Sequence, residues 1–160
     1  MALAGIAVVT LLFMGLAALS QNDPRAIRKM LSAVASDASV DPKQGLFVRQ
    51  AHGTRLRDRF TADVALKYRE VSTESVRGRA ELMEYITAAR SSLQQASLRF
   101  TQVQIEISKD RNAAVVRTVL EGDLNGERNA LRDELTLALQ KIDHRWVIDE
   151  IEASVPATGR

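Results

Sequence analysis

The sequence predicts an α+β domain, with helices packed on one side of a strongly bent, mostly antiparallel sheet, preceded by one transmembrane helix. Apolar residues recur at helical spacing in the first half of the folded part, and they alternate at strand spacing in the second half. Such a separation of helices from strands is typical of α+β proteins. The chain has 160 residues, the size of a single domain with its own core.

The opening segment, residues 2–19, contains no charged residue and predicts a membrane-spanning helix. A helix of this length extends about 27 Å, enough to cross the core of a bilayer. We therefore expect residues 1–20 to form an uncleaved signal anchor that contacts membrane lipid through residues 2–19. Two alternatives remain open. One is a buried helix of a soluble protein, and the other is a signal peptide cleaved after Ser20.

The charges beside the segment do not fix its orientation. Arg25, Arg28 and Lys29 follow it, and the positive-inside rule would keep that side in the cytoplasm. Asp23 lies on the same side, and the amino terminus places one positive charge on the other.

The first two helices are predicted after this segment. Asp23 as N-cap and Pro24 at the first helical position favour a helix that continues to about residue 36. Asp41-Pro42 and Gly45 then indicate a loop. A second helix is expected over residues 46–60. Its apolar side would comprise Phe47, Ala51, Leu56 and Phe60.

A strand and a third helix come next. Val64, Leu66 and Tyr68 alternate in the strand pattern, and a turn with a short strand follows. Gly78 precedes a helix over residues 79–90. Leu82, Tyr85, Ile86 and Ala89 would face inward from this helix.

The rest of the chain predicts long strands. In residues 98–107 the apolar phase slips by one residue between Phe100 and Val103, which indicates a β-bulge and a bend. Asn125-Gly126 is a favoured hairpin turn, and Asp143-His144 is the next turn. The inward face of the strand between these two turns would comprise Leu131, Leu135, Leu137 and Leu139.

Several stretches together resemble the NTF2-like superfamily and its SnoaL-like relatives. They are DPRAIRKML, VRGRAELMEYI, LRFTQVQIEI followed by DRNAAVVRTVLEG, and LQKIDHRWVIDEI. The resemblance implies a cone-shaped domain over residues 21–155, followed by a tail at 156–160. It also implies two functions: enzymes of this superfamily place an Asp, His or Tyr inside the cone, and non-enzymes bind proteins.

We expect a non-catalytic accessory or assembly subunit that binds integral membrane proteins, because no catalytic signature is present. Anchored relatives are exported, so the domain is expected in the periplasm. The alternative is an enzyme of the lyase or isomerase type that binds a small apolar ligand in the cone. The fold alone does not choose between them.

Composition excludes some chemistries. The chain has no Cys and therefore no disulfide, thiolate metal site or cysteine nucleophile. Its net charge of +2 argues against nucleic acid. His52 and His144 share no metal-ligand spacing, and no phosphate-binding loop is present, so no metal or cofactor is expected.

Under the enzyme alternative the candidate residues are Asp133, Tyr68 and Arg117, each in phase with apolar neighbours. Asp133 would act as general base if it points into the cone and is desolvated there. The alternative is that it lies at the end of its strand, where this face is already in contact with water. Arg117 would instead pair with a carboxylate such as Glu121. Bulky aliphatic residues are expected to fill the cone and to leave no ligand-sized cavity. The predicted lining is Leu98, Phe100, Val115, Val119, Leu135, Leu137, Leu139, Ile27, Leu31, Leu82, Tyr85, Ile86 and Trp146.

Overall fold

A computed structural model of the chain describes residues 22–69 and 76–154, and the order of elements is the predicted α+β order. The elements are a helix at residues 22–38, α2 (Leu46–Arg57), β1 (Phe60–Tyr68), β2 (Val76–Arg77), α3 (Arg79–Ser91), β3 (Ala96–Ile107), β4 (Ala113–Leu124), β5 (Glu127–Ile142) and β6 (Arg145–Ala153). The predicted span at residues 1–20 lies outside the described residues. Within them, no helix combines the length and apolarity needed to cross a membrane.

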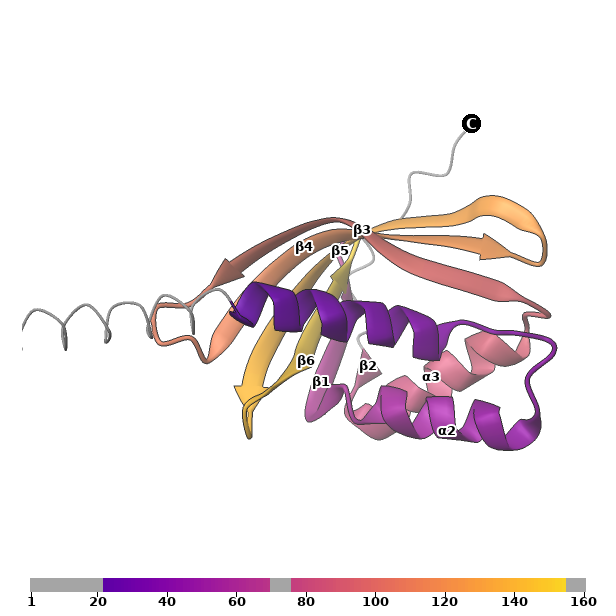
Figure 1. Cartoon of the computed structure of the whole chain (residues 1–160), viewed down its shortest axis with the longest axis horizontal. Coiled ribbons are helices and arrows are strands. Elements are labelled where there is room, and N and C mark those ends of the chain that lie inside the picture. Colours follow the sequence, from indigo (N-terminus) through magenta and orange to yellow (C-terminus); the bar gives the residue numbers. More distant parts are fainter. Residues whose placement is uncertain (1–21, 70–75, 155–160) are drawn as a thin grey trace, which may run out of the picture.

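The described strands form one six-stranded sheet in the order β2-β1-β6-β5-β4-β3. All neighbours are antiparallel except β1 and β6, which run parallel. The sheet is strongly curved, and the helices lie on one side of it (Figure 1). The long hairpin of β4 and β5 extends beyond β6, because Ala153 at the end of β6 pairs with Leu135 while β5 begins at Glu127.

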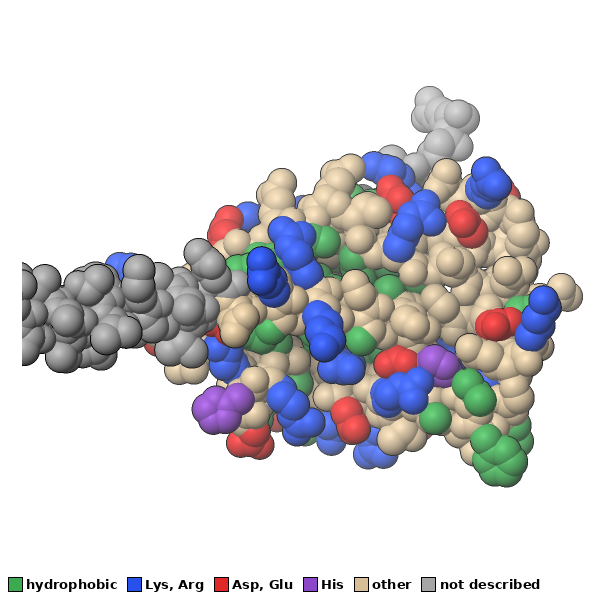
Figure 2. Space-filling view, viewed as in Figure 1, with side chains coloured by type: hydrophobic (Ala, Val, Ile, Leu, Met, Phe, Trp, Pro, Cys, Tyr) green, Lys and Arg blue, Asp and Glu red, His purple; other side chains and the backbone are tan. Residues whose placement is uncertain are grey.

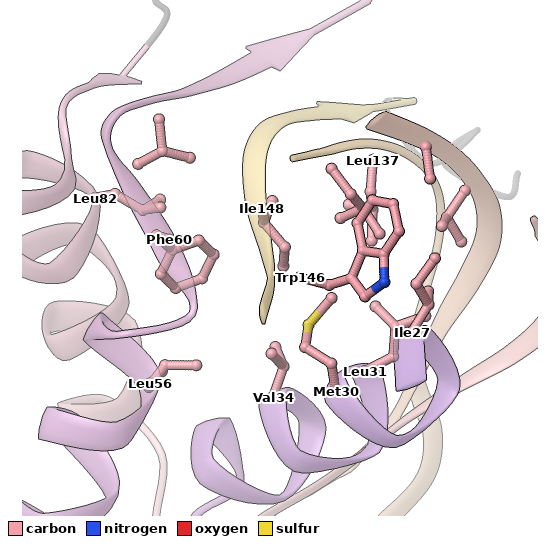
Figure 3. Packing of buried hydrophobic residues seen from close by; sticks show 14 of the residues in the cluster. Ile27, Met30, Leu31, Val34, Leu56, Phe60, Leu82, Leu137, Trp146 and Ile148 are labelled. Carbon is pink, nitrogen blue, oxygen red and sulfur yellow. The ribbon is translucent and has the colours of Figure 1, made fainter. Parts of the chain in front are cut away.

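The first part of the helix at residues 22–38 fills one half of the concave face. Ile27, Leu31 and Val34 recur at helical spacing and are all buried. Figure 3 shows Trp146 of β6 beside Leu137 of β5 and close to this helix. Trp146 is 5% exposed, so its predicted place in the core is confirmed. This half of the molecule is closely packed.

Asp23 fastens the same helix to the sheet. Its carboxylate accepts hydrogen bonds from Arg111 (2.6 Å), Lys141 (2.8 Å) and the indole of Trp146 (3.3 Å). The prediction of Asp23 as N-cap is wrong, because residue 22 is already helical and the side chain turns into these contacts. Burial raises the pKa of Asp23, but the hydrogen bonds from Lys141, Arg111 and Trp146 outweigh burial and lower it below its ordinary value.

The bend and the turns of the sheet follow the sequence. In β3 the register shifts between Thr101 and Gln104, which confirms the predicted bulge, and Gln102 there has a φ of 52°. Asn125 and Asp143 have φ values of 50° and 48° in their turns, as hairpin turns of this kind require.

The second helix differs from its prediction. It ends at Arg57, Phe60 begins β1, and Phe47 is 85% exposed. Pairing with the last strand explains the early end, since the amide of Ile148 donates to the carbonyl of Arg59 (2.8 Å) and draws the chain into the sheet. Helical spacing alone cannot reveal such a long-range constraint. Only Leu56 of α2 is fully buried.

Leu137→Ala should lower the free energy of unfolding by roughly 2–5 kcal/mol, because Leu137 is 1% exposed and its removal leaves empty space in the core. Chemical denaturation monitored by the fluorescence of Trp146 measures the loss. Ile142→Ala on the same strand is the control, since Ile142 is 46% exposed and should change stability by less than about 0.5 kcal/mol. Equal losses for the two variants would contradict the described packing.

Asp23→Asn should lower the free energy of unfolding by about 2 kcal/mol at pH 7, because it removes the negative charge that accepts from Lys141 and Arg111. The loss is smaller than for a fully buried pair, since the Arg111 side chain is 33% exposed. The folded pKa of Asp23 is lowered, so its contribution to stability is present above the ordinary aspartate pKa of 3.8 and is lost as pH falls through the folded pKa.

Denaturation at pH 7 and near pH 2 checks this prediction, and the difference between the wild type and Asp23→Asn should shrink at the lower pH. Glu106→Gln is the control, because Glu106 and Arg117 form an exposed pair whose loss should cost little. A difference that does not depend on pH would contradict the assignment to the charge of Asp23.

Candidate functional site

The other half of the cone contains a cavity of about 370 Å³. The expectation of a filled cone is therefore wrong. The physical reason is a set of small residues on three elements: Ala35 and Ala38 of the N-terminal helix, Ala89 of α3 and Ala96 of β3 all line the cavity. Each element contributes only one or two of these alanines, so inspection of one helix at a time does not reveal the space.

The predicted lining is partly correct. Leu98, Phe100, Leu135, Leu137, Leu82, Tyr85 and Ile86 line the cavity. The lining does not include Ile27, Leu31, Leu139, Trp146, Val115 or Val119. The first four of these are buried in the packed half, and Val115 is 38% exposed.

Gly122 shapes the wall formed by β3, β4 and β5. Leu98, Gly122 and Leu131 lie opposite one another across these three strands. A Cβ atom at position 122 would lie 2.7 Å from Cδ2 of Leu98 and 3.3 Å from Cβ of Leu131. The glycine thus allows the two leucines to close over β4 without filling the cavity.

Asp133 lies on this wall. It is opposite Leu120 and shares the inward face of β5 with Leu135 and Leu137, so its predicted phase is confirmed. The wet position expected for it is observed only in part. The residue is half-buried, but its Oδ1 is fully buried and accepts no hydrogen bond from any described residue. Burial raises the pKa of Asp133 above its ordinary value.

Tyr68 and Tyr85 form a hydroxyl pair at the same cavity. Their hydroxyl oxygens are 2.9 Å apart, Tyr68 coming from the end of β1 and Tyr85 from α3. Burial, the bond to Tyr85 and the nearby charge of Asp133 raise the pKa of Tyr68 to about 12. Tyr68 therefore stays protonated at neutral pH. One of the two hydroxyl protons is used within the pair, and the other remains available to a ligand oxygen.

Arg117 does not join this group. The inward residues of β4 are those at even positions, such as Val116 and Thr118, which pair with inward residues of β5. Arg117 is therefore on the outer face, where its guanidinium donates to Glu106 (2.7 Å). The predicted partner Glu121 binds Arg99 and Arg132 instead. The register between β4 and its neighbours sets the outward direction of Arg117. The sequence of one strand does not reveal that register.

Arg90 is a cavity residue that sequence reasoning missed. It follows Ile86 by one helical turn on α3 and lines both the cavity and an outer cleft between α2 and α3. Its Nε atom is buried and donates to no described residue. The signal was present, since Arg90 lies on the same helical face as Leu82 and Ile86.

The histidines take no part in the cavity. His52 lies on α2, where its Nδ1 is 2.7 Å from Oδ1 of the buried Asp37. His144 is exposed in its turn. Within residues 22–69 and 76–154 no three His, Asp or Glu side chains are grouped in a way that could hold a metal ion.

Solved structures share this fold. A protein of unknown function with a cystatin-like fold from Nostoc punctiforme has a TM-score of 0.66 at 14% identity, over 85% of this chain and 92% of that one. A "putative scytalone dehydratase" from Novosphingobium aromaticivorans has a TM-score of 0.66 at 16% identity, over 84% of each chain. An NTF2-like protein from the same organism has a TM-score of 0.65 at 13% identity, over 98% of this chain and 92% of that one.

At these identities the likeness shows the fold alone, which is the NTF2-like fold. No curated protein matches the sequence. The family of SnoaL-like domains matches residues 47–158, which is more than half of the chain. The chain therefore belongs to the SnoaL-like domain family.

Proposed function

We propose that this protein is an acid–base enzyme of the lyase or isomerase type that acts on a small, largely apolar carbonyl compound. The observation that carries the proposal is Asp133, whose buried Oδ1 has no described partner and faces an apolar cavity. A buried polar atom without a partner destabilises the fold, so its presence in a ligand-sized space favours a functional role.

Asp133 would be the general base. Burial raises the pKa of Asp133, which makes its carboxylate a stronger base than that of an exposed aspartate. In the step we propose, the free oxygen of Asp133 accepts a proton from the carbon next to the carbonyl of the substrate. The electron pair of that C–H bond moves toward the carbonyl oxygen. Where the substrate has a carbon–carbon double bond between its β and γ carbons, the electron pair of the enolate extends over that bond. Asp133 then returns the proton to the γ carbon, the double bond moves to the α and β carbons and the carbonyl re-forms, which completes an isomerisation.

The tyrosine pair would stabilise the negative charge that develops on the carbonyl oxygen. The proton not shared between Tyr68 and Tyr85 can be donated to this oxygen. Because the pKa of Tyr68 is about 12, the hydroxyl donates a hydrogen bond without losing its proton at neutral pH. Elimination of a β-hydroxyl group would use the same proton abstraction, and this is the lyase form of the reaction.

The comparisons are compatible with this chemistry. The structural neighbour named as a scytalone dehydratase is by its name a lyase. At 16% identity its substrate does not transfer to this chain. The argument for catalysis therefore depends on the cavity and on Asp133.

A second candidate is an accessory subunit that is anchored in the membrane through residues 2–19 and binds integral membrane proteins from the periplasm. It has one structural observation in its favour. Leu46, Phe47 and Val48 at the start of α2 are 68%, 85% and 46% exposed, and Figure 2 shows hydrophobic side chains gathered at that end of the molecule. Purification in mild detergent tests this candidate, because a lone monomer would argue against it. A C-terminal reporter fusion tests the compartment.

Asp133→Asn should reduce catalysed exchange of the α-hydrogens of 4-phenylbutan-2-one for deuterium by at least about a hundredfold, because the amide cannot accept the proton. Proton nuclear magnetic resonance in deuterated buffer measures the exchange. Tyr68→Phe should reduce it by about tenfold or more, since Tyr85 keeps one hydroxyl in place. The wild-type rate should rise with pH through a pKa above 3.8, because burial raises the pKa of Asp133.

Arg117→Gln on the outer face is the control and should leave the exchange unchanged. Asp133→Asn should also raise the free energy of unfolding, and more at pH 7 than at pH 3. The folded pKa of Asp133 is raised, so ionisation costs stability as pH rises. If wild-type protein accelerates no exchange, or if Asp133→Asn retains it, the proposed function is wrong.

A further inference from the structure

Arg90 is a cation in a costly position. Its Nε atom is buried without a partner among the described residues, and the hydrogen bond from its Nη2 to the carbonyl of Ser39 is long (3.5 Å). No described carboxylate forms an ion pair with it. Asp37, the acidic group whose charge acts on Arg90, is already bound by His52 (2.7 Å) and Arg55 (3.1 Å). A cation removed from water without a counter-ion destabilises the folded protein.

Arg90 and Asp133 share this property and this cavity. Among the described residues, the buried side-chain atoms without a hydrogen-bond partner are Arg90 Nε and Asp133 Oδ1, and both residues line the same space. Everywhere else in the described part of the chain the buried side-chain polar atoms are satisfied. The cavity therefore presents one unpaired cation and one unpaired carboxylate on otherwise apolar walls.

We propose that the substrate is an apolar carboxylic acid whose carboxylate binds the guanidinium of Arg90, while its carbonyl group lies at Tyr68 and Tyr85. The inference rests on the proposed function and names the substrate class of that site. Arg90 would be a specificity-determining residue. The carboxylate would accept from Nε, and its charge would balance the cation.

The positions of the groups set the length of the substrate. Arg90 follows Tyr85 by five residues on α3, which separates their Cα atoms by about 7.5 Å along the helix axis, and this backbone spacing is the basis for the substrate length. A carbonyl and a carboxylate joined by a short apolar chain or by one ring match this separation. The cavity of about 370 Å³ has room for such a body. Repulsion by the ionised Asp133 favours the orientation with the carboxylate at Arg90.

The test compares one acid with its neutral amide. 6-Oxo-6-phenylhexanoate has a ketone and a carboxylate separated by four methylene groups, and 6-oxo-6-phenylhexanamide has the same shape without the charge. Titration calorimetry on the full chain at pH 7 should show that the acid binds about tenfold or more tightly than the amide. Arg90→Gln should remove this preference and leave the affinity for the amide within about twofold.

Arg49→Gln is the matched control. Arg49 is exposed on α2 and lines the outer cleft but not the cavity, so its loss should leave the preference for the acid unchanged. Equal affinity of wild-type protein for acid and amide would overturn the proposal. An equal loss of affinity for the acid and for the amide in Arg90→Gln would also overturn the proposal. If Arg90→Gln does not fold, the comparison of the two ligands on wild-type protein still decides.

The two proposals can fail separately. A preference for the acid that depends on Arg90, without catalysed exchange, would refute the proposed function and support the assignment of Arg90 as an anion site. Exchange of neutral ketones that depends on Asp133, without any preference for the acid, would refute the substrate class and leave the catalytic proposal in place.

Discussion

The ion-paired carboxylate of Asp23 determines where the N-terminal helix can lie on the sheet. Its bonds to Arg111, in the turn between β3 and β4, and to Lys141 near the end of β5 fix the start of the helix at one end of the curved sheet. The stripe of Ile27, Leu31 and Val34 then covers the sheet from that end. Beyond it the helix presents Ala35 and Ala38, and the cavity begins there. The position of the site thus follows from an interaction at the other end of the helix.

The sequence predicted the features that depend on local patterns. The bulge of β3 was visible in the sequence as a slip of the apolar phase between Phe100 and Val103. The turn at Asn125-Gly126 was visible as a pair of residues that readily adopt positive φ, and both have positive φ in the structure. The inward phase of Asp133 was also readable from its leucine neighbours. Features that depend on pairing between distant elements were not readable. The outward direction of Arg117 is set by its register with β5, and the end of α2 is set by a bond from Ile148.

The cavity was missed for a related reason. Its space comes from small residues contributed one or two at a time by separate elements, and only the assembled fold brings them together. The same assembly places Arg90 at the cavity, whereas Tyr85 was expected in the lining from its position on the inward face of α3. The signal for Arg90 was its helical spacing from Ile86, which marks an inward direction but does not reveal that the charge lacks a partner.

The two faces of the sheet differ in whether their charged side chains have counter-ions. On the outer face Glu121 accepts from both Arg99 and Arg132, and Lys67 donates to Glu150, so each charge has a counter-ion beside water. On the inner face Arg90 and Asp133 each bury a polar atom that has no hydrogen-bond partner among the described residues. Isolated charges of this kind reduce stability, and proteins retain such costs mainly where function requires them.

The parallel pairing of β1 with β6 affects how the domain can fold while the ribosome synthesises it. Phe60 pairs with Ile148, and Tyr68 with Ala153, so β1 gains its long neighbour only when the last strand has been made. Until then Val64 and Leu66, fully buried in the finished domain, have no sheet to cover them. Contacts so distant in sequence form slowly, and exposed apolar strands invite aggregation in the meantime. The cavity wall that carries Tyr68 is therefore completed only after the residues of β6 have been made.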